Sequence, residues 1–535
     1  MLFRSALDGT RSEDGSAPRP DLLAAQRAHH FTQDAARPDA VARRHQSGRR
    51  TVRENLADLL DPDSLVEYGA LAVAAQRTRR SLDELQQQTP ADGLVTGTAT
   101  INAALVGDAR AHCAVMAYDY TVLAGTQGMY NHRKSDRLID VAERQRLPMV
   151  LLAEGGGGRP GDVDWISAAS GLECSTFQRF ARLSGQVPMV GVVAGRCFAG
   201  NAVLLACCDV IIATESTSLG MGGPAMIEGG GLGIVDPDAV GPVSVQAPNG
   251  VVDWVVRDEA AAMAAARQYL ALFQVRELPD CGPGGDPLSL RAAVPANRHV
   301  TYDVRAIVHT LCDLGSVIEL RPQHGAGIVT SLTRMGGRTV AVAASNPRHL
   351  GGALDGPACD KLARFLSLAD AFGIPVVMLI DSPGFMVGPE SEKTAMVRRA
   401  GRLFVTAASL RVPLFSVMLR RGYGLGAMAL AGGHFHAPLA TASWPTGEFG
   451  PMGIDGAVRL GFKKELQAAP VQERTALHQR LAAEMLERGG AINVARHTEV
   501  DDVIDPADTR RWLMRNLATS EAAPLPLRRG VVLAW

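Results

Sequence analysis

The sequence predicts an α/β protein made of two similar domains in tandem, each with a mostly parallel sheet and flanking helices. Short apolar strands alternate with helical segments, and this order is typical of parallel strands buried between helices. The order of strand, glycine loop, helix, strand, glycine turn and helix then occurs twice within 535 residues. A single α/β domain would not require the glycine turns to recur together with the strands.

The first copy begins with buried strands at 147–154 and 187–195, and the second with strands at 374–381 and 412–420. A helix is expected between the two strands of each copy, over 166–184 in the first and 397–410 in the second. Prolines open all four strands, and the interval from Pro148 to Pro188 nearly equals the interval from Pro375 to Pro413. We therefore interpret the two copies as homologous.

Each copy carries a glycine turn after its second strand. The turn glycine is Gly200 in the first copy and Gly426 in the second, and Gly426 stands only one position further from Pro413 than Gly200 does from Pro188. The predicted organisation is an N-terminal arm (1–40), a first domain (41–290) and a second domain (291–535).

The basic stretch from Arg43 to Arg53 leads into a helix whose leucines have helical spacing. The favoured interpretation of this stretch is the solvated face of a helix, and a phosphate-binding role is the minority interpretation.

The composition excludes several classes of protein. Lys+Arg 54 against Asp+Glu 55 leaves a net charge of -1, and aromatic residues make up 5%, so no extended surface for nucleic acid is expected. The first twenty residues lack a signal-peptide pattern, and no apolar run could span a membrane. The eight cysteines form no C-x-x-C pair. We expect a cytoplasmic protein that binds neither membrane nor nucleic acid.

The glycine loops and turns suggest a chemistry that relies on the main chain. An N–H group at the start of a helix is a preorganised donor, and two such groups pointing at one atom form an oxyanion hole. Glycine allows the close approach that a side chain would block. The alternative, that these glycines serve only tight turns and packing, is favoured for either copy alone but not for both together.

Other motifs are absent or weak. There is no dinucleotide-binding G-x-G-x-x-G, no P-loop and no G-x-S-x-G nucleophile elbow. His434 and His436 could be a metal pair, but alternating histidines beside a Gly-Gly are more often structural, and no metal site is expected. Asp119, Asp381 and Glu448 lie near strand ends and could act as acids or bases, although carboxylates there more often cap helices.

Several longer motifs resemble one known family. They are RRHQSGRRTVRENLADLLDPDSLVE, DYTVLAGTQGMYNHRK, EGGGGR, VPMVGVVAGRCFAGNA, IPVVMLIDSPGF, RRGYGLGAMALAGG and WPTGEFGPMG. Together they resemble the carboxyltransferase (beta) component of biotin-dependent acyl-CoA carboxylases, in the crotonase superfamily. The resemblance implies two crotonase-like (ClpP/crotonase) domains, with acyl-CoA bound by the first and carboxybiotin by the second domain of a partner subunit.

The resemblance also implies roles for single residues. Main-chain amides at Ala199 and Gly200 would hold the thioester oxygen, and amides at Gly426 and Ala427 would hold the biotin oxygen. The acyl-CoA loop would comprise Gly156, Gly157, Gly158 and Arg159, and the biotin side Gly384, Phe385 and Gly424. The second turn, Y-G-L-G-A, is one residue longer than the family's Y-G-G-A, with Leu425 as the additional residue.

The implied reaction transfers CO2 from carboxybiotin to the α carbon of an acyl-CoA, through enolates held in the two oxyanion holes. Because the chain lacks a biotinylation motif and an ATP-binding signature, it would need a biotin carboxylase and a biotin carboxyl carrier protein. The expected assembly is a hexamer built from dimers. Two alternatives stay open: a malonyl- or methylmalonyl-CoA decarboxylase, and a non-catalytic paralogue of the same fold.

Overall fold

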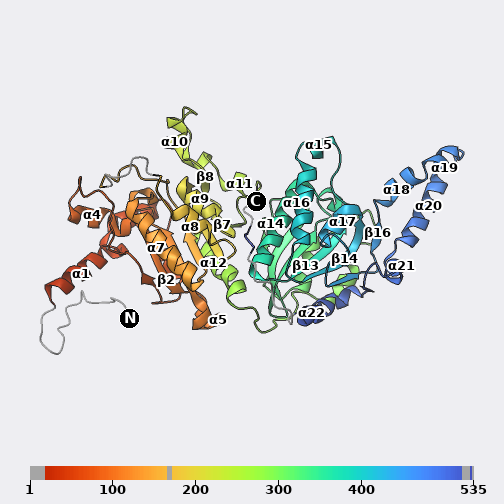
Figure 1. Ribbon diagram of the computed structural model, residues 1–535, viewed down its shortest axis with the longest axis horizontal. Helices are drawn as coiled ribbons and strands as arrows, with labels where there is room; N and C mark the ends of the chain where they lie inside the picture. The colour runs from red at the N-terminus through yellow and green to blue at the C-terminus, as the bar shows by residue number, and fades with distance from the viewer. Residues whose placement is uncertain (1–18, 165–171, 521–529, 533–535) are drawn as a thin grey trace. The chain divides into compact units, whose positions relative to one another are not determined.

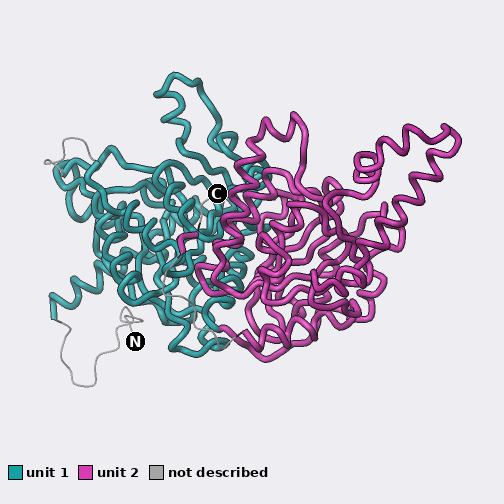
Figure 2. The backbone as a smooth tube through the Cα atoms, turned by 45° about the vertical axis from the view of Figure 1, so that its right-hand side comes forward, with its two compact units in different colours: residues 1–275 teal, residues 276–535 magenta. Residues whose placement is uncertain are grey.

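The computed structural model describes residues 19–164, 172–520 and 530–532. The chain divides into two compact units, residues 1–275 (unit 1) and 276–535 (unit 2), coloured separately in Figure 2. The predicted domain boundary at 290/291 lies inside unit 2, which begins at Arg276. Residues 1–18 of the predicted arm and residues 166–171 of the predicted helix over 166–184 lie outside the described residues. Residues 19–40 of the arm contain helix α1 and the start of α2 (Figure 1).

Unit 1 is built on a seven-stranded sheet with the order β1-β2-β3-β4-β5-β7-β9. The pairs β1/β2 and β2/β3 are antiparallel, and every pair from β3 to β9 is parallel. The strands are β1 (Val66–Glu67), β2 (Leu94–Thr100), β3 (His112–Tyr118), β4 (Met149–Leu152), β5 (Met189–Val193), β7 (Val210–Thr214) and β9 (Trp254–Val256), with β6 (Arg196–Phe198) and β8 (Ser218–Gly220) forming a separate pair.

The helices of unit 1 precede, separate and follow these strands, and at least one lies between each two successive parallel strands of the sheet. They are α1 (Pro20–His30), α2 (Pro38–Gln46), α3 (Val52–Leu59), α4 (Leu82–Gln88), α5 (Ala103–Val106), α6 (Asp108–Ala111), α7 (Met129–Gln145), α8 (Thr176–Ala181), α9 (Gly200–Ala206), α10 (Pro224–Gly229), α11 (Val243–Gln246) and α12 (Glu259–Gln274).

Unit 2 repeats this plan with the order β10-β11-β12-β13-β14-β15-β17, and β16 pairs with β14. The first two pairs are again antiparallel and the others parallel. The strands are β10 (Ile318–Leu320), β11 (Ile328–Met335), β12 (Arg338–Ser345), β13 (Val376–Ser382), β14 (Leu414–Tyr423), β15 (Ala440–Ser443), β16 (Glu448–Gly450) and β17 (Asp502–Val503).

The helices of unit 2 include a long one, α14, that precedes β13 as α7 precedes β4. They are α13 (Val304–Leu311), α14 (Gly356–Phe372), α15 (Pro389–Glu392), α16 (Met396–Ala408), α17 (Gly424–Leu430), α18 (Ile454–Gly461), α19 (Lys463–Ala468), α20 (Arg474–Arg488), α21 (Ala491–Arg496) and α22 (Thr509–Thr519). The prediction of two similar, mostly parallel α/β units in tandem is confirmed.

The two sheets also agree in register. Met149 pairs with Met189 in unit 1, and Val376 pairs with Leu414 in unit 2. Each of these four residues directly follows one of the strand-opening prolines. The prolines fall at strand starts because proline has no N–H group to donate to the ladder. Residues at the same distance from these prolines are therefore structurally equivalent in the two units.

A buried lysine occupies equivalent positions in α7 and α14. Lys134 stands as far before Pro148 as Lys361 does before Pro375. The Nζ of Lys134 donates to the carbonyls of Ala91 and Leu94, and the Nζ of Lys361 donates to two carbonyls of unit 2 at 2.8 Å each. These bonds satisfy a charged group that would otherwise be costly to bury.

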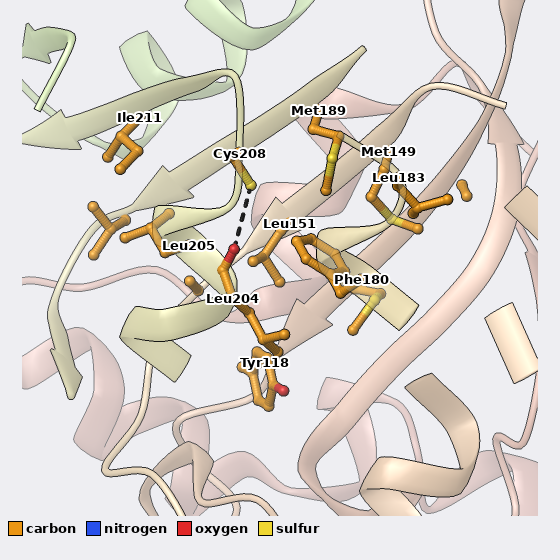
Figure 3. Close-up of a cluster of buried hydrophobic side chains, with 14 of the residues drawn as sticks. Tyr118, Met149, Leu151, Phe180, Leu183, Met189, Leu204, Leu205, Cys208 and Ile211 are labelled. Atoms are coloured by element: carbon orange, nitrogen blue, oxygen red, sulfur yellow. Dashed lines mark hydrogen bonds between the residues drawn. The ribbon is translucent and has the colours of Figure 1, made fainter. Parts of the chain in front are cut away.

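The core of unit 1 packs helices α7, α8 and α9 against the sheet. Figure 3 shows part of this cluster, in which Phe180, Leu183 and Leu204 meet the strand residues Leu151 and Met189. A second cluster fills unit 2 around Trp444 and Phe415 of its sheet. Among the described residues, no helix combines the length and the apolar character needed to cross a membrane.

Candidate active site

The first glycine loop lies at the carboxyl end of β4 and is held by a neighbouring segment. The N–H of Gln127 donates to the carbonyl of Gly157 at 2.7 Å, and the N–H of Arg159 returns a bond to the carbonyl of Gln127 at 2.8 Å. Gly157 has φ 87°, a backbone conformation that favours glycine. A Cβ at Gly157 would lie 2.6 Å from the Cβ of Ala199, so only glycine lets the loop approach the turn.

The turn that opens α9 has an unusual backbone. Ala199 has φ 49° and ψ −122°, and helix α9 begins at Gly200. The N–H of Ala199 already donates to the carbonyl of Gly220 at 3.1 Å, so it is not available to a ligand in this conformation. A Cβ at Gly200 would collide with Oε1 of Gln127, so a side chain at the first helical position would require the Gln127 side chain to move.

The side chain of Asn201 holds the glycine loop against the turn through hydrogen bonds. No local pattern in the sequence indicates this role. Asn201 is fully buried; its amide nitrogen donates to the carbonyls of Gly125 at 3.2 Å and Glu154 at 3.4 Å. Its Oδ1 accepts from the N–H of Gly157 at 3.0 Å. Within the described residues, the N–H groups of Gly156, Gly158 and Gly200 have no protein acceptor, and they are the donors that this site could offer to a ligand.

Arg159 points inward and does not present a charge to a ligand. Its guanidinium lies 2.5 Å from the carboxylate of Asp92 and donates to the carbonyl of Thr126 at 2.7 Å. Its side chain is 5% exposed. Burial raises the pKa of Asp92, although Arg159 acts in the opposite direction. The Arg159 side chain therefore holds the loop in place through its bonds to Asp92 and Thr126.

The glycine loop of unit 2 has the same construction. The N–H of Leu354 donates to the carbonyl of Gly384 at 3.0 Å, and the N–H of Met386 returns a bond to Leu354 at 2.8 Å. Gly384 has φ 123°, and its N–H lies 3.2 Å from the hydroxyl of Ser382. A Cβ at Gly426 would lie 2.6 Å from the carbonyl carbon of Gly384, so the turn again packs directly on the loop.

The register corrects the pairing of the two turns. The residue with positive φ is Ala199 in unit 1 and Gly424, with φ 59°, in unit 2, and Ala199 stands as far from Pro188 as Gly424 does from Pro413. Leu425 is therefore the equivalent of Gly200, and Gly426 is the equivalent of Asn201. The predicted pairing of Gly200 with Gly426 is wrong by one position, and relative to the first turn Leu425 is a substitution and not an insertion.

Leu425 can occupy this position because its side chain points into open space. That side chain is 63% exposed, whereas the equivalent space at Gly200 is filled by Gln127 and Phe177. Helix α17 supplies first-turn N–H groups at Leu425, Gly426 and Ala427, which have no acceptor four residues earlier within the helix. Gly424 has a positive φ, and this backbone conformation sets the direction of the N–H groups of the turn.

A carboxylate paired with arginine lies at the end of the strand before each glycine loop. Glu154 stands as far after Pro148 as Asp381 does after Pro375. Arg44 binds Glu154 with two bonds, at 2.9 and 2.6 Å, and is buried, so the prediction of a solvated helix face is wrong for this arginine. Asp381 is fully buried between the guanidinium groups of Arg420 and Arg421. Both carboxylates are structural and are not free to act as acids or bases.

The other acidic candidates are also engaged. Asp119 binds Arg37 at 2.8 Å, and Glu448 accepts from Tyr423 at 2.7 Å. The rings of His434 and His436 lie 5.5 Å apart. The described ranges contain no group of three His, Cys, Asp or Glu side chains placed to hold a metal ion. The donors that remain at the two turns are main-chain N–H groups.

Two α/β units that each hold main-chain donors at a helix start have an arrangement suited to an enzyme that stabilises negative charge on a carbonyl oxygen. The comparison with known proteins then specifies the family. The family model described as carboxyl transferase domain matches residues 43–529, and the chain belongs to this family.

Relatives and solved structures agree with this assignment. The chain is 32% identical over 487 residues to the methylmalonyl-CoA carboxyltransferase 12S subunit of Propionibacterium freudenreichii, covering 88% of each chain. It is 32% identical over 497 residues to the biotin-dependent long chain acyl-coenzyme A carboxylase beta4 subunit of Mycobacterium tuberculosis, covering 89% of this chain and 90% of the relative.

Two structures have the same fold. A single-chain, multi-domain long-chain acyl-CoA carboxylase matches with 55% identity and a TM-score of 0.88, and the match covers 93% of this chain. This chain spans about half, 49%, of that larger chain. The hexameric transcarboxylase 12S matches with 29% identity and a TM-score of 0.82, over 97% of this chain and 98% of the other. The predicted crotonase-like fold and acyl-CoA carboxyltransferase class are confirmed.

Proposed function

We propose that this chain is the carboxyltransferase component of a biotin-dependent acyl-CoA carboxylase, and that unit 1 binds the acyl-CoA. The observation that carries the proposal is the equivalent pair of loops and turns, each with unused main-chain donors. Family membership supports the reaction class, and the duplicated construction supports one oxygen-binding site in each unit.

In unit 1, the N–H of Gly200 and an N–H of the Gly156–Arg159 loop would hold the thioester oxygen. The acyl group must lose a proton from its α carbon, which places negative charge on that oxygen. Because the donors are fixed by Asn201 and Gln127 before the substrate arrives, no reorganisation is needed when the charge develops.

In unit 2, the first-turn N–H groups of Leu425, Gly426 and Ala427, with Gly384 and Phe385 opposite, would hold the urea oxygen of biotin. The fit rests on the close approach of Gly426 to Gly384 and on donors that suit a neutral carbonyl acceptor. When bound, carboxybiotin supplies the CO2. Gly424 would set the direction of the donors.

The substrate we propose is a long-chain acyl-CoA. The support is the 55% identity to the long-chain enzyme, which exceeds the 28% identity to the methylmalonyl-CoA decarboxylase subunit of Veillonella parvula. We further propose that a biotin carboxylase and a biotin carboxyl carrier protein act with this chain in the cytoplasm. A hexamer built from dimers is supported by the hexameric 12S structure.

A carboxylation assay tests the proposal. The purified chain, with a biotin carboxylase, a biotinylated carrier, ATP and bicarbonate, is offered acetyl-, propionyl- and palmitoyl-CoA, and the carboxylated product is measured. We expect product from palmitoyl-CoA at the highest kcat/KM. Consumption of malonyl- or methylmalonyl-CoA with no forward product would favour the decarboxylase, and no turnover in either direction would favour the non-catalytic paralogue.

A further inference from the structure

A cluster of reactive side chains lies near the turn that opens α9. The Sγ of Cys174 lies 3.3 Å from Nδ1 of His132 in α7. The same nitrogen lies 3.1 Å from the hydroxyl of Thr176. The hydroxyls of Ser175 and Thr176 donate to the two oxygens of Asp136, at 2.6 Å each. The proposed carboxyl transfer uses none of these groups.

The surroundings favour the ionised form of this thiol. Burial alone would raise the pKa of Cys174, but the hydrogen bond and the charge of His132 outweigh it and lower the pKa below its ordinary value. Cys207 is partly buried like Cys174, and there burial raises the pKa. The opposite direction at Cys174 follows from its histidine neighbour. Thiolates are the reactive form of cysteine, and histidine partners are a common cause of reactivity.

The cluster contacts the turn through an aromatic ring. The ring of His132 lies edge-on to Phe177, with centroids 5.9 Å apart. The Cζ of Phe177 lies 3.1 Å from the position that a Cβ of Gly200 would occupy. A group added to the thiol of Cys174 would press on His132, and through His132 on the ring that lies beside Gly200.

A second set of contacts reaches the same turn from the strand side. The hydroxyl of Tyr118, whose pKa is raised mainly by burial and to a lesser extent by the Cys197 and Cys174 thiols, accepts from Nε2 of Gln127 at 2.9 Å. The other end of the Gln127 amide, Oε1, lies directly beside Gly200. Tyr118 and Gln127 therefore connect the surroundings of the thiol to the proposed oxygen-binding turn.

We propose that Cys174 is a site of reversible modification by low-molecular-weight disulfides, and that its modification disables the Gly200 turn. The Cys174 thiolate attacks one sulfur of the disulfide, that S–S bond breaks, and a mixed disulfide forms. The departing thiolate takes a proton from His132 or from solvent. The Cys174 sulfur is oxidised and the released thiol is reduced, so that the electrons balance without a further oxidant.

The first half of the proposal is tested without any enzyme assay. The full-length chain is alkylated with iodoacetamide over a range of pH, and labelling of each cysteine is followed by mass spectrometry. We expect the midpoint for Cys174 to lie at lower pH than that for the exposed Cys281, which serves as the reference within the same chain. His132→Asn should raise the Cys174 midpoint relative to that of the unsubstituted protein. Equal midpoints for the two cysteines in the unmodified protein would overturn the proposal.

The second half rests on the proposed carboxyltransferase function. The chain is treated with 5,5′-dithiobis(2-nitrobenzoate) and assayed with palmitoyl-CoA before and after addition of dithiothreitol. We expect about a 10²-fold loss of kcat that dithiothreitol reverses, as a small displacement of a catalytic turn produces. Cys174→Ser should keep the basal activity and resist the reagent.

The outcomes separate the two proposals. Full activity of a chain shown by mass to be modified at Cys174 overturns the link to the turn. Absence of carboxyl transfer in every untreated form argues against the proposed function, whereas the alkylation midpoints still decide whether Cys174 is a reactive site.

Discussion

Gly200 and Leu425 occupy the same position in the two units. Gly200 stands as far from Pro188 as Leu425 does from Pro413, and each directly follows a residue with positive φ, 49° at Ala199 and 59° at Gly424. At one position the space for a side chain is occupied by Gln127 and Phe177, whereas the other carries a leucine that is 63% exposed. Because the Leu425 side chain is exposed, the N–H group of Leu425 can be removed by substitution without disturbing side-chain packing in unit 2.

Leu425→Pro removes the N–H of this residue in the first turn of α17, where proline is tolerated. If that N–H holds the biotin oxygen, kcat should fall by roughly 10²–10³-fold, the usual effect of losing one oxyanion donor. The measurement is carboxyl transfer from a biotinylated carrier. Leu425→Ala is the matched control, because it shortens the side chain and keeps the donor. Equal kcat values for the two variants would contradict the role of this amide.

Ala199→Gly should stabilise the protein. Ala199 has φ 49° and ψ −122°, a conformation that strains a residue with a Cβ and costs about 1–3 kcal/mol. Part of the gain is offset by the greater freedom of glycine in the unfolded chain, so we expect an increase of about 1 kcal/mol in the free energy of unfolding. Urea unfolding measures it. The control, Ala202→Gly inside the same helix, should lower stability by about 1 kcal/mol.

Asn201→Asp should weaken both the fold and the binding of acyl-CoA. The substitution replaces an amide nitrogen that donates to two buried carbonyls with an oxygen that repels them. We expect a loss of roughly 2–5 kcal/mol in the free energy of unfolding. The two carbonyls lose their donor, and the new carboxylate oxygen faces them without one. Asn201→Asp should also raise KM for acyl-CoA relative to Asn249→Asp, a control at an exposed asparagine of the same unit. A stable variant with unchanged KM would show that the loop and the turn do not depend on this side chain.

Lys134 gives a pH dependence of stability. Burial lowers its pKa to about 8, whereas an unfolded lysine has a pKa of about 10.4. Between these values the unfolded chain binds more protons, so the free energy of unfolding should rise with pH. The total rise in the free energy of unfolding across this range is about 3 kcal/mol. Well below the folded pKa, Lys134 is protonated in both states and contributes no pH dependence.

The measurement is denaturant unfolding at two values of pH, one near the folded pKa and one near the unfolded pKa, with Lys134→Met as the control. Because other groups titrate in the same range, the difference between the two proteins is the informative quantity. This difference in the free energy of unfolding should change by about 2 kcal/mol between the two pH values. The unsubstituted chain gains stability relative to Lys134→Met at the higher pH. A constant difference would mean that burial does not lower the pKa of Lys134.

Arg44→Met should destabilise unit 1 by roughly 3–5 kcal/mol, because it leaves the buried carboxylate of Glu154 without its partner. Adding Glu154→Gln to this variant should recover part of the loss, since one of the two carboxylates near Arg44 is then uncharged, whereas Glu259, 3.8 Å from the guanidinium, still loses that charge. Thermal unfolding of the single and double variants measures both effects. Additive losses in the double variant would contradict a mutual pairing of these two residues.

The sequence predicted the fold because its strongest signals are local. Apolar strands opened by prolines, and glycine loops at their ends, determine the two sheets and the position of the loops. The same signals located the loops at Gly157 and Gly384, which the structure places against the turns. The pairing of Gly200 with Gly426 failed because it matched two glycines that stand at unequal distances from the prolines, whereas equal distances and the positive φ of the preceding residue pair Gly200 with Leu425.

The side chains that organise the site were harder to predict. Arg44 lies among other basic residues, and nothing in that pattern distinguishes a buried arginine from a solvated one. Arg159 was expected to meet the ligand, yet its partner Asp92 lies 67 residues earlier in the chain. Asn201 makes its three bonds to residues 44 to 76 positions away. Contacts of this range follow from the fold and leave no local pattern.

The difference between Gly200 and Leu425 limits how far the two halves of the gene can exchange sequence. A copy of the second turn placed in the first half would drive a leucine into the space held by Gln127 and Phe177. Gene conversion between the halves across this segment would therefore disturb the packing of the first turn.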